Sequence, residues 1–157
     1  MVIEDNLIIN NGRLSSSGDG VDFRFGINCI LRNNTIQGNT KDGIYLQQCS
    51  EIYLAKNKIR LNQHNGINIF KGSNLTIGDS CEDCGNIING NLEHGVKAYQ
   101  GSTHLNFYNN YLGMDPNQVP PIPNGMTGMF LSDCDTIQIG KPGAGNFIAG
   151  NISSGIK

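Results

Sequence analysis

Residues 57–69 have the sequence NKIRLNQHNGINI, and the same arrangement recurs along the chain. Asn-x-Ile or Asn-x-Leu opens each unit, a second Asn follows five residues later in all but one copy, and a Gly-apolar-x-apolar segment closes the unit. The closing glycines Gly20, Gly43 and Gly66 are 23 residues apart, and the later steps of 29, 33 and 27 residues are the same unit with insertions. A fixed period of this length is typical of stacked units that bury a core only together.

The repeated asparagines form two columns. The first contains Asn6, Asn34, Asn57, Asn86, Asn110 and Asn146. The second contains Asn11, Asn39, Asn62, Asn91 and Asn151, with Asp115 in the remaining place. At the corner of a coil, Asn tolerates a left-handed φ, and its amide supplies hydrogen bonds to backbone groups that have no strand partner. We therefore expect both columns to be structural ladders, whose side chains also bond to one another along the axis.

Short segments of alternating apolar and polar residues lie between these asparagines and glycines, which predicts three brief strands in each unit and no helix. The apolar anchors of the first strand are Cys29-x-Leu31, Ile52-x-Leu54, Leu75-x-Ile77, Leu105-x-Phe107 and Ile137-x-Ile139. Strands this short must pair with the same strand of the next unit. The sequence therefore predicts an all-β parallel solenoid, a single domain over residues 1–157 with about six coils of ~23 residues and inserted loops.

Two stretches carry a family resemblance, residues 77–96 and residues 139–156. Their Asn-x-Ile, Gly-Asn and Gly-Ile steps resemble the right-handed parallel β-helix repeat of the pectate-lyase-like superfold, in a version found in bacterial surface proteins. Residues 111–115 with residues 123–125 resemble the longer turn of that version. The resemblance implies a right-handed parallel β-helix. It implies no single function, because the superfold includes lyases, hydrolases, epimerases, phage tail parts and non-catalytic surface domains.

The amino-acid composition limits the classes of partner that we expect for this protein. Only 15% of the residues are charged, the net charge is −2, and the chain has 21 Gly and 22 Asn, which indicates a neutral, amide-rich surface. We expect no nucleic-acid partner because the sequence has no basic stripe, and no membrane span because it has no run of about 18 apolar residues. Residues 1–5 lack the basic and apolar regions of a signal peptide. We expect either an intracellular protein or a part of a longer secreted chain, at the cell surface or outside the cell.

Five cysteines do not suggest a disulfide framework, because the number is odd. Cys49 and Cys134 repeat one coil position, and Cys29 replaces a core anchor, as a small apolar residue can. The remaining pair forms a CxxC motif, Cys81-Glu82-Asp83-Cys84, in an inserted loop. A metal or redox pair is the functional interpretation, but zinc takes four ligands, and the sequence has neither a second CxxC nor a close pair of histidines.

The outward positions of the Gly-apolar-x-apolar segments are where the resemblance implies that a sugar chain binds across successive coils. Two columns are predicted to project there. One contains Asp22, Tyr45, Asn68, Lys97 and Phe130. The other contains Asp19, Asp42, Asn65, His94, Thr127 and Ser154. Tyr45 and Asn68 are the candidate ligand-binding residues of this face.

The same columns suggest a catalytic site. Asp19, Asp22 and Asp42 would lie on neighbouring coils and could share a hard cation such as Ca²⁺. His94 and Lys97 could then act as base and charge neutraliser in removing the proton α to a uronate carboxylate. Against this, Asp-Gly and Asn-Gly are ordinary turn dipeptides. The chain also lacks the acidic pairs and Arg-containing motifs of galacturonan hydrolases and lyases, and the Asp-Pro-His-Glu signature of alginate epimerases.

A second candidate surface is aromatic. Tyr111 and Phe147 share a column with Ile87 and are predicted to point outward, as a sugar-stacking strip or a subunit contact. The longest insertion, Pro116 to Pro123, could wall a groove or cap a turn. Neither end of the chain has the polar cap that closes a solenoid, which suggests a fragment, end-to-end stacking, or a partner at the end.

Three functions remain open. The sequence favours a non-catalytic module that binds carbohydrate or lies at a surface, because the catalytic signatures are missing. The second is a polysaccharide lyase or epimerase acting on uronate polymers. The third is a structural segment that forms homo-oligomers through its open ends or its exposed apolar column.

Overall fold

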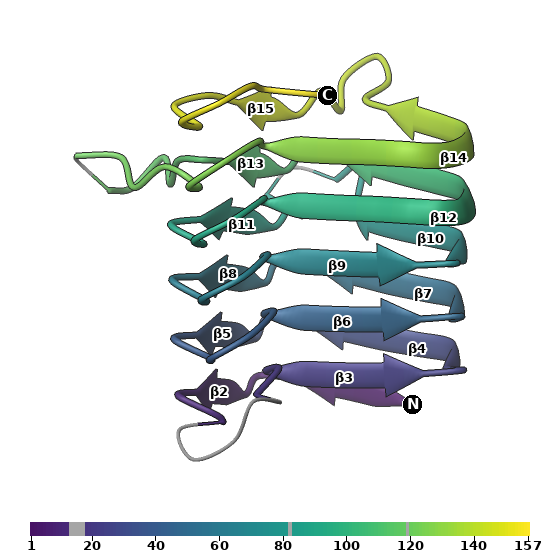
Figure 1. The fold of residues 1–157 in the computed structure, drawn as a ribbon. Coiled ribbons are helices and arrows are strands. Elements are labelled where there is room, and N and C mark those ends of the chain that lie inside the picture. The colour runs from purple at the N-terminus through teal and green to yellow at the C-terminus, as the bar shows by residue number, and fades with distance from the viewer. Residues whose placement is uncertain (13–17, 82, 119) are drawn as a thin grey trace.

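The computed structural model describes residues 1–12, 18–81, 83–118 and 120–157. These residues wind into stacked coils whose strands all pair in parallel (Figure 1). The strands are β1 (Val2–Glu4), β2 (Leu7–Ile9), β3 (Val21–Arg24), β4 (Ile27–Arg32), β5 (Thr35–Gln37), β6 (Ile44–Gln47), β7 (Ser50–Ala55), β8 (Lys58–Arg60), β9 (Ile67–Phe70), β10 (Ser73–Gly78), β11 (Ile87–Asn89), β12 (Val96–Tyr108), β13 (Tyr111–Leu112), β14 (Met129–Ile139) and β15 (Phe147–Ile148). The predicted all-β parallel helix is confirmed.

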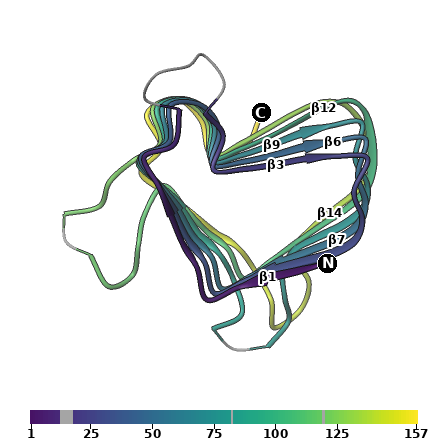
Figure 2. The same ribbon diagram turned by 90° about the horizontal axis from the view of Figure 1, so that it is seen from below.

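The coils enclose the core with three faces, which are seen along the axis in Figure 2. The first face contains β1, β4, β7, β10 and the C-terminal parts of β12 and β14. The second is the six-stranded sheet of β2, β5, β8, β11, β13 and β15. The third contains β3, β6, β9 and the N-terminal parts of β12 and β14. Because β12 and β14 continue round the corner, the third and first faces form one sheet.

The predicted anchors line up between coils. Ile52 pairs with Cys29 on one side and Leu75 on the other, and Leu105 continues the column to Ile137. These side chains belong to one continuous apolar cluster along the axis, in which Phe107 is fully buried. The described residues form no helix that is long and apolar enough to cross a membrane.

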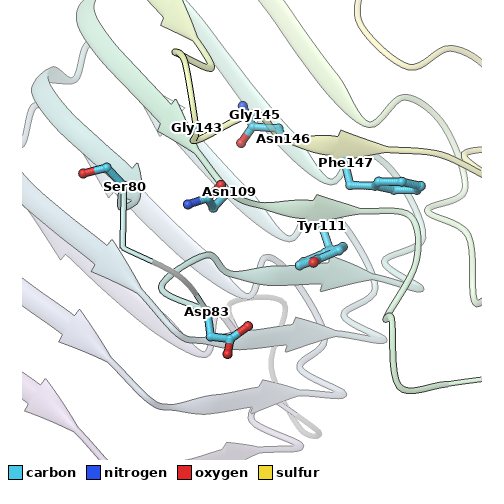
Figure 3. A pocket seen from close by; sticks show the side chains of 8 residues that line it. All are labelled: Ser80, Asp83, Asn109, Tyr111, Gly143, Gly145, Asn146 and Phe147. Atoms are coloured by element: carbon cyan, nitrogen blue, oxygen red, sulfur yellow. The ribbon is translucent and has the colours of Figure 1, made fainter.

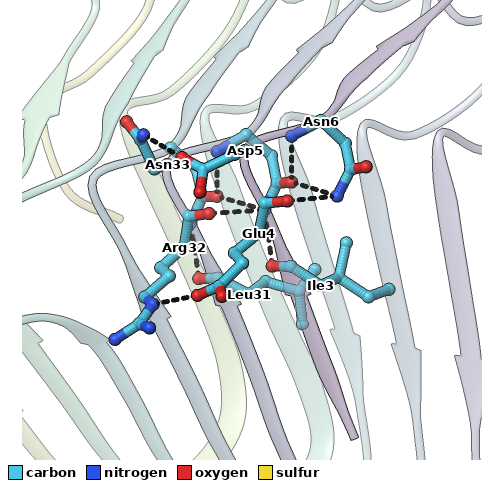
Figure 4. Close-up of polar contacts among 9 residues, drawn as sticks. Ile3, Glu4, Asp5, Asn6, Leu31, Arg32 and Asn33 are labelled. Carbon is cyan, nitrogen blue, oxygen red and sulfur yellow. Dashed lines mark hydrogen bonds and ion pairs between the residues drawn. The ribbon is translucent and has the colours of Figure 1, made fainter.

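The first asparagine column is a hydrogen-bonded ladder. Asn57 Nδ2 donates to Asn86 Oδ1 (2.9 Å) and to Leu31 O (2.9 Å), while Asn57 Oδ1 accepts from Asn34 N and Nδ2 (3.0 Å each). Figure 4 shows the N-terminal end of this corner, where an ion pair joins Glu4 to Arg32 in the next coil. Asn side chains of one coil thus supply hydrogen bonds to the backbone N–H and C=O groups at the turn of a neighbouring coil.

The second ladder contains Asn124 where the sequence predicted Asp115. Asn91 Nδ2 donates to Asn124 Oδ1 (3.0 Å), and Asn124 Nδ2 donates to Asn151 Oδ1 (2.9 Å). Asp115 is buried nearby and accepts a hydrogen bond from Asn117 N (2.9 Å). The prediction was wrong because the longest insertion lies between the two ladder positions of this coil and displaces the second position to Asn124.

The closing glycines lie so close to the backbone of the next coil that no side chain fits between them. A Cβ atom on Gly43 would lie 2.7 Å from Gly66 O, and one on Gly66 would lie 2.6 Å from Gly95 O. The same approach recurs from Gly95 to Gly128 O and from Gly128 to Gly155 O, at 2.7 Å each. A side chain at this corner would therefore separate the stacked coils.

One disulfide is present, which the sequence did not predict. Cys81 and Cys84 are bonded within the CxxC loop, where Cys84 N donates to Cys81 O (3.3 Å) and the α-carbons lie 5.4 Å apart. Glu82, within the same motif, lies outside the described residues. Cys29 and Cys49 are free and buried, as small core residues. The tight turn of the insertion explains the bond, because it brings together two cysteines only three residues apart.

Candidate functional site

A groove of about 350 Å³ follows the third face across successive coils. Asp19 and Arg24 line it from the first coil, and Tyr99 lines it from the β12 coil. Between them lie Lys41, Asp42, Tyr45, Gln47, His64 and Asn68. The groove therefore runs along the axis of the solenoid and brings together aromatic, amide, acidic and basic side chains.

The first predicted column lies in register on this face. Asp22 pairs with Tyr45, Tyr45 with Asn68, and the column continues to Lys97 and Phe130. Four of its members are partly exposed and Asp22 is exposed, as the alternation of a strand with one buried face requires. The register thus places Tyr45 and Asn68, the predicted ligand-binding residues, beside each other in the groove.

Cations lie over the tyrosine rings of the groove. Arg24 Cζ is 5.9 Å from the centre of the Tyr45 ring, and Lys97 Nζ is 5.1 Å from that of Tyr99. Burial raises the pKa of Tyr45, and the neighbouring Tyr99 raises it further. Both tyrosines therefore present neutral phenol rings, whose faces can stack and whose hydroxyl groups can hydrogen-bond.

The second predicted column lies at the edge of this face, where Asp19 and Asp42 line the groove. Asp42, Asn65 and Thr127 are buried at the corner that precedes it. Asn65 N and Nδ2 both donate to Asp42 Oδ1 (2.8 Å), and Asp42 N donates to Asp19 Oδ1 (2.9 Å). The turn interpretation of these residues therefore fits the structure, and they form a third polar ladder.

The three aspartates have separate partners. Asp22 pairs with Arg24 (3.1 Å), and Asp42 Oδ2 accepts from Asn68 Nδ2 (2.7 Å). Burial raises the pKa of Asp19, with a further contribution from the Asp42 carboxylate, although the hydrogen bond from the Asp42 backbone opposes the shift. Within the described chain, no group of three or more His, Cys, Asp or Glu side chains is arranged to hold a metal ion. The geometry therefore gives no support to the predicted Ca²⁺ site.

His94 is oriented by its neighbours. Its ring stacks on Phe130, with centres 4.9 Å apart, and its Nδ1 accepts from Thr127 N (3.4 Å). Burial lowers the pKa of His94, and the adjacent Lys97 lowers it further. The neutral imidazole then carries its proton on Nε2 and uses its free lone pair in the ladder, so it is poorly placed as a general base.

The lowered pKa of His94 predicts a pH-dependent stability. The unfolded chain binds this proton at the ordinary pKa of about 6.5, whereas the folded chain binds it only at lower pH. The contribution of neutral His94 is therefore fully present above that value and is lost as the pH falls towards the folded pKa. Urea unfolding across this range should show the loss in the wild type and a reduced loss in His94→Gln. An NMR titration that gives His94 an ordinary or raised pKa would contradict this assignment.

A second hollow of about 710 Å³ lies at the corner between the first and second faces, and it contains the other two predicted ligand-binding residues. Tyr111 and Phe147 project there from β13 and β15, with ring centres 6.1 Å apart (Figure 3). The structure therefore divides the predicted ligand-binding residues between two separate places. The described residues of the insertion 116–123 line neither of them.

Several groove residues were missed from the sequence, among them Lys41, His64 and Tyr99. Lys41 and His64 form a column of their own, since His64 N donates to Lys41 O (3.1 Å). They precede Asp42 and Asn65 by one residue. The repeat contains a signal for all three. Lys41 and His64 lie one residue before the second predicted column, and Tyr99 lies two residues after Lys97 of the first.

Comparison with known proteins agrees with this architecture. The family model for the right handed beta helix region matches residues 1–112. Two crystal structures of the periplasmic alginate epimerase AlgG, a single and a double mutant, have TM-scores of 0.61 and 0.60 with 16% identity. Each comparison covers 99% of this chain but 38% of the epimerase chain, so the chain spans less than half of those proteins. No curated protein matches the sequence. The predicted right-handed β-helix is confirmed, and the likeness concerns the fold alone.

Proposed function

We propose that this chain, which belongs to the right-handed β-helix family, is a non-catalytic module that binds an extended polysaccharide along the groove of its third face. The observation that carries the proposal is the lining of the groove by Tyr45, Asn68 and Tyr99 from successive coils. Coils stack about 4.8 Å apart, so a linear polymer parallel to the axis meets a new set of side chains at each coil. Aromatic faces and amides are the groups that bind sugar rings and their hydroxyls.

Asn68 supplies a polar group that is suited to a ligand. Its Nδ2 is engaged by Asp42, whereas its buried Oδ1 has no hydrogen-bond partner among the described residues. Leaving such a buried acceptor unpaired costs about 1–3 kcal/mol. A sugar hydroxyl or a water molecule that donates to Asn68 Oδ1 would recover this energy.

The hydrogen bonds that the acidic and basic groups already make within the protein favour binding over catalysis. Asp42 accepts three hydrogen bonds from Asn65 and Asn68, and His94 uses Nδ1 within the same ladder. Moving a proton at either group would disrupt the corner on which the groove depends. Asp19 Oδ1 likewise accepts from the Asp42 backbone.

Two observations favour a second candidate, a lyase or epimerase acting on uronate polymers. Arg24 and Lys41 place cations in the groove, where they could bind carboxylates. The fold is also that of an alginate epimerase. The two candidates share a substrate class, and they differ in whether product forms.

The groove proposal predicts that Tyr45→Ala weakens polysaccharide binding about tenfold, or about 1.4 kcal/mol, because it removes a stacking surface without opening the core. Binding is measured by calorimetry with alginate, polygalacturonate and a neutral glucan. The matched control is Phe25→Ala, which removes an aromatic ring that is 64% exposed and does not line the groove. Equal binding by wild type and Tyr45→Ala would contradict the proposal.

Ultraviolet absorbance of unsaturated products and NMR of the recovered polymer, recorded on the same mixtures, separate the two candidates. Binding without chemical change supports the module. Unsaturated or epimerised product formed by the wild-type chain would establish the enzyme. Concentration-dependent association without sugar binding would instead favour end-to-end assembly of the coils.

A polysaccharide ligand would also indicate where the protein acts, inside or outside the cell. We further propose that residues 1–157 act as one solenoid domain outside the cytoplasm, as expected for a protein that meets extracellular or periplasmic polymers.

A further inference from the structure

The corner hollow is built by two insertions that are far apart in the sequence. One lies between β10 and β11 and contributes Ser80 and Asp83. The other lies between β14 and β15 and contributes Gly145. Figure 2 shows both insertions leaving the solenoid at the same corner, away from the third face. The hollow is therefore separate from the groove and uses none of its residues.

Described residues of the first insertion are held by hydrogen bonds and by the disulfide. Asn109 Nδ2 donates to Asp79 O (2.8 Å) and to Cys81 O (3.1 Å), and the Cys81–Cys84 disulfide closes the loop. The Asp79 carboxylate in turn accepts from Tyr53 OH (2.7 Å). A ligand entering here would therefore meet a pre-formed wall, which reduces the entropic cost of binding.

The aromatic surface of the hollow suits a flat, partly apolar ligand. Tyr111 and Phe147 stack with an angle of 30° between their rings, and Phe147 is 52% exposed at the end of the column (Figure 3). Both rings emerge from neighbouring strands on the same side of the sheet. The carbon-bound hydrogens of a pyranose ring can pack against such a surface.

The polar groups around the rings indicate the charge of the ligand. Asp83, Ser80 and Asn109 supply carboxylate, hydroxyl and amide groups that can bond to sugar hydroxyls. The described lining residues include one carboxylate and no Lys, Arg or His. An anionic ligand would meet the Asp83 carboxylate with no cation among the described lining residues, in contrast to the groove with its Arg24 and Lys41.

We propose that this corner hollow is a second carbohydrate site, which binds one or two residues of a neutral sugar by stacking on Tyr111 and Phe147. Its volume of about 710 Å³ lies within the ordinary range of small-molecule sites. The module then binds sugar at two places with different charge preferences. The site does not depend on the groove, so either proposal can fail without the other.

Gly145 offers a sharp test. Gly145 lines the hollow, and a Cβ atom added to it would meet nothing within 4 Å in a backbone that is not left-handed, so Gly145→Leu adds a bulky side chain at the hollow without a clash at its Cβ. We expect maltose or cellobiose at millimolar concentration to shift the amide NMR signals of residues 143, 145 and 147. Gly145→Leu should abolish saturable binding, and Phe147→Ala should weaken it about five- to tenfold.

Two controls decide the outcome. Leu7→Ala removes an apolar side chain that is 68% exposed, from the other end of the same column, and should bind like wild type. Tyr45→Ala should also retain binding in the hollow. The site is overturned if neither neutral disaccharide shifts these signals, or if binding survives in Gly145→Leu. Preferential binding of glucuronic acid would overturn the neutral assignment.

Discussion

Gly66→Ala should lower the free energy of unfolding by about 3 kcal/mol, the upper end of the usual cost of overpacking. The new Cβ would lie 2.5 Å from Ile88 Cγ2, 2.6 Å from Gly95 O and 2.8 Å from Asn91 Nδ2. The last two atoms belong to the backbone of the next coil and to a buried ladder, so neither can rotate away. Urea unfolding measures the loss.

Gly145→Ala is the matched control for this change. Its added Cβ meets open space, and the residue is not left-handed. The same chemical substitution should therefore be neutral, or stabilise by up to about 1 kcal/mol through the reduced entropy of the unfolded chain. If both variants unfold at the same urea concentration, then close approach between coils is not the reason for the glycine column.

The glycine column was predicted from the sequence, but for a different reason. The Asp-Gly and Asn-Gly dipeptides indicated that the glycine completes a turn, a role that glycine often fills by adopting a left-handed φ. Gly20, Gly43 and Gly66 are not in the left-handed region. The repeat revealed the position because every coil makes the same contact, whereas the cause of that contact lies in the neighbouring coil and has no local sequence signal.

The corners of the solenoid show a further limit of local reasoning. Phe25, Leu61 and Lys71 all have φ between 54° and 60°, although none of these residue types favours that region. The strain is imposed by stacking, since each belongs to a corner shared with other coils. Propensity alone would not place a left-handed residue there.

The candidate site was predictable where strand alternation holds. The column from Asp22 through Tyr45 to Asn68 lies on the third face as expected. The column from Asp19 through Asp42 to Asn65 was predicted to project from that face. Asp42 and Asn65 are instead buried at the corner that precedes the strand, where alternation does not continue, although Asp19 and Asp42 still line the groove. The aromatic column of Tyr111 and Phe147 was predicted as a candidate surface, but the hollow around it was not, since it depends on two insertions that meet only when the coils stack.

Asn57→Ala, in the middle of the first ladder, should also lower the free energy of unfolding by about 3 kcal/mol. The change takes hydrogen bonds from Leu31 O, Asn34 N and Asn34 Nδ2 at a buried corner, whereas Asn86 Oδ1 keeps the bond from the backbone N of residue 57. A buried polar group left unpaired costs about 1–3 kcal/mol, and no strand rearrangement within one coil can supply the missing partners. The loss is measured by urea unfolding, with circular dichroism to verify the folded state.

Asn6→Ala tests whether burial is what makes the ladder stabilising. Asn6 occupies the same column but is exposed, and it donates to Glu4 O (2.7 Å) and to Asn34 Oδ1 (3.0 Å). Water can replace both bonds, so the expected loss is about 1 kcal/mol or less. Equal losses in the two variants would mean that ladder bonds stabilise the coils regardless of solvent. A negligible loss in Asn57→Ala would instead assign the stability of the solenoid to its apolar columns alone.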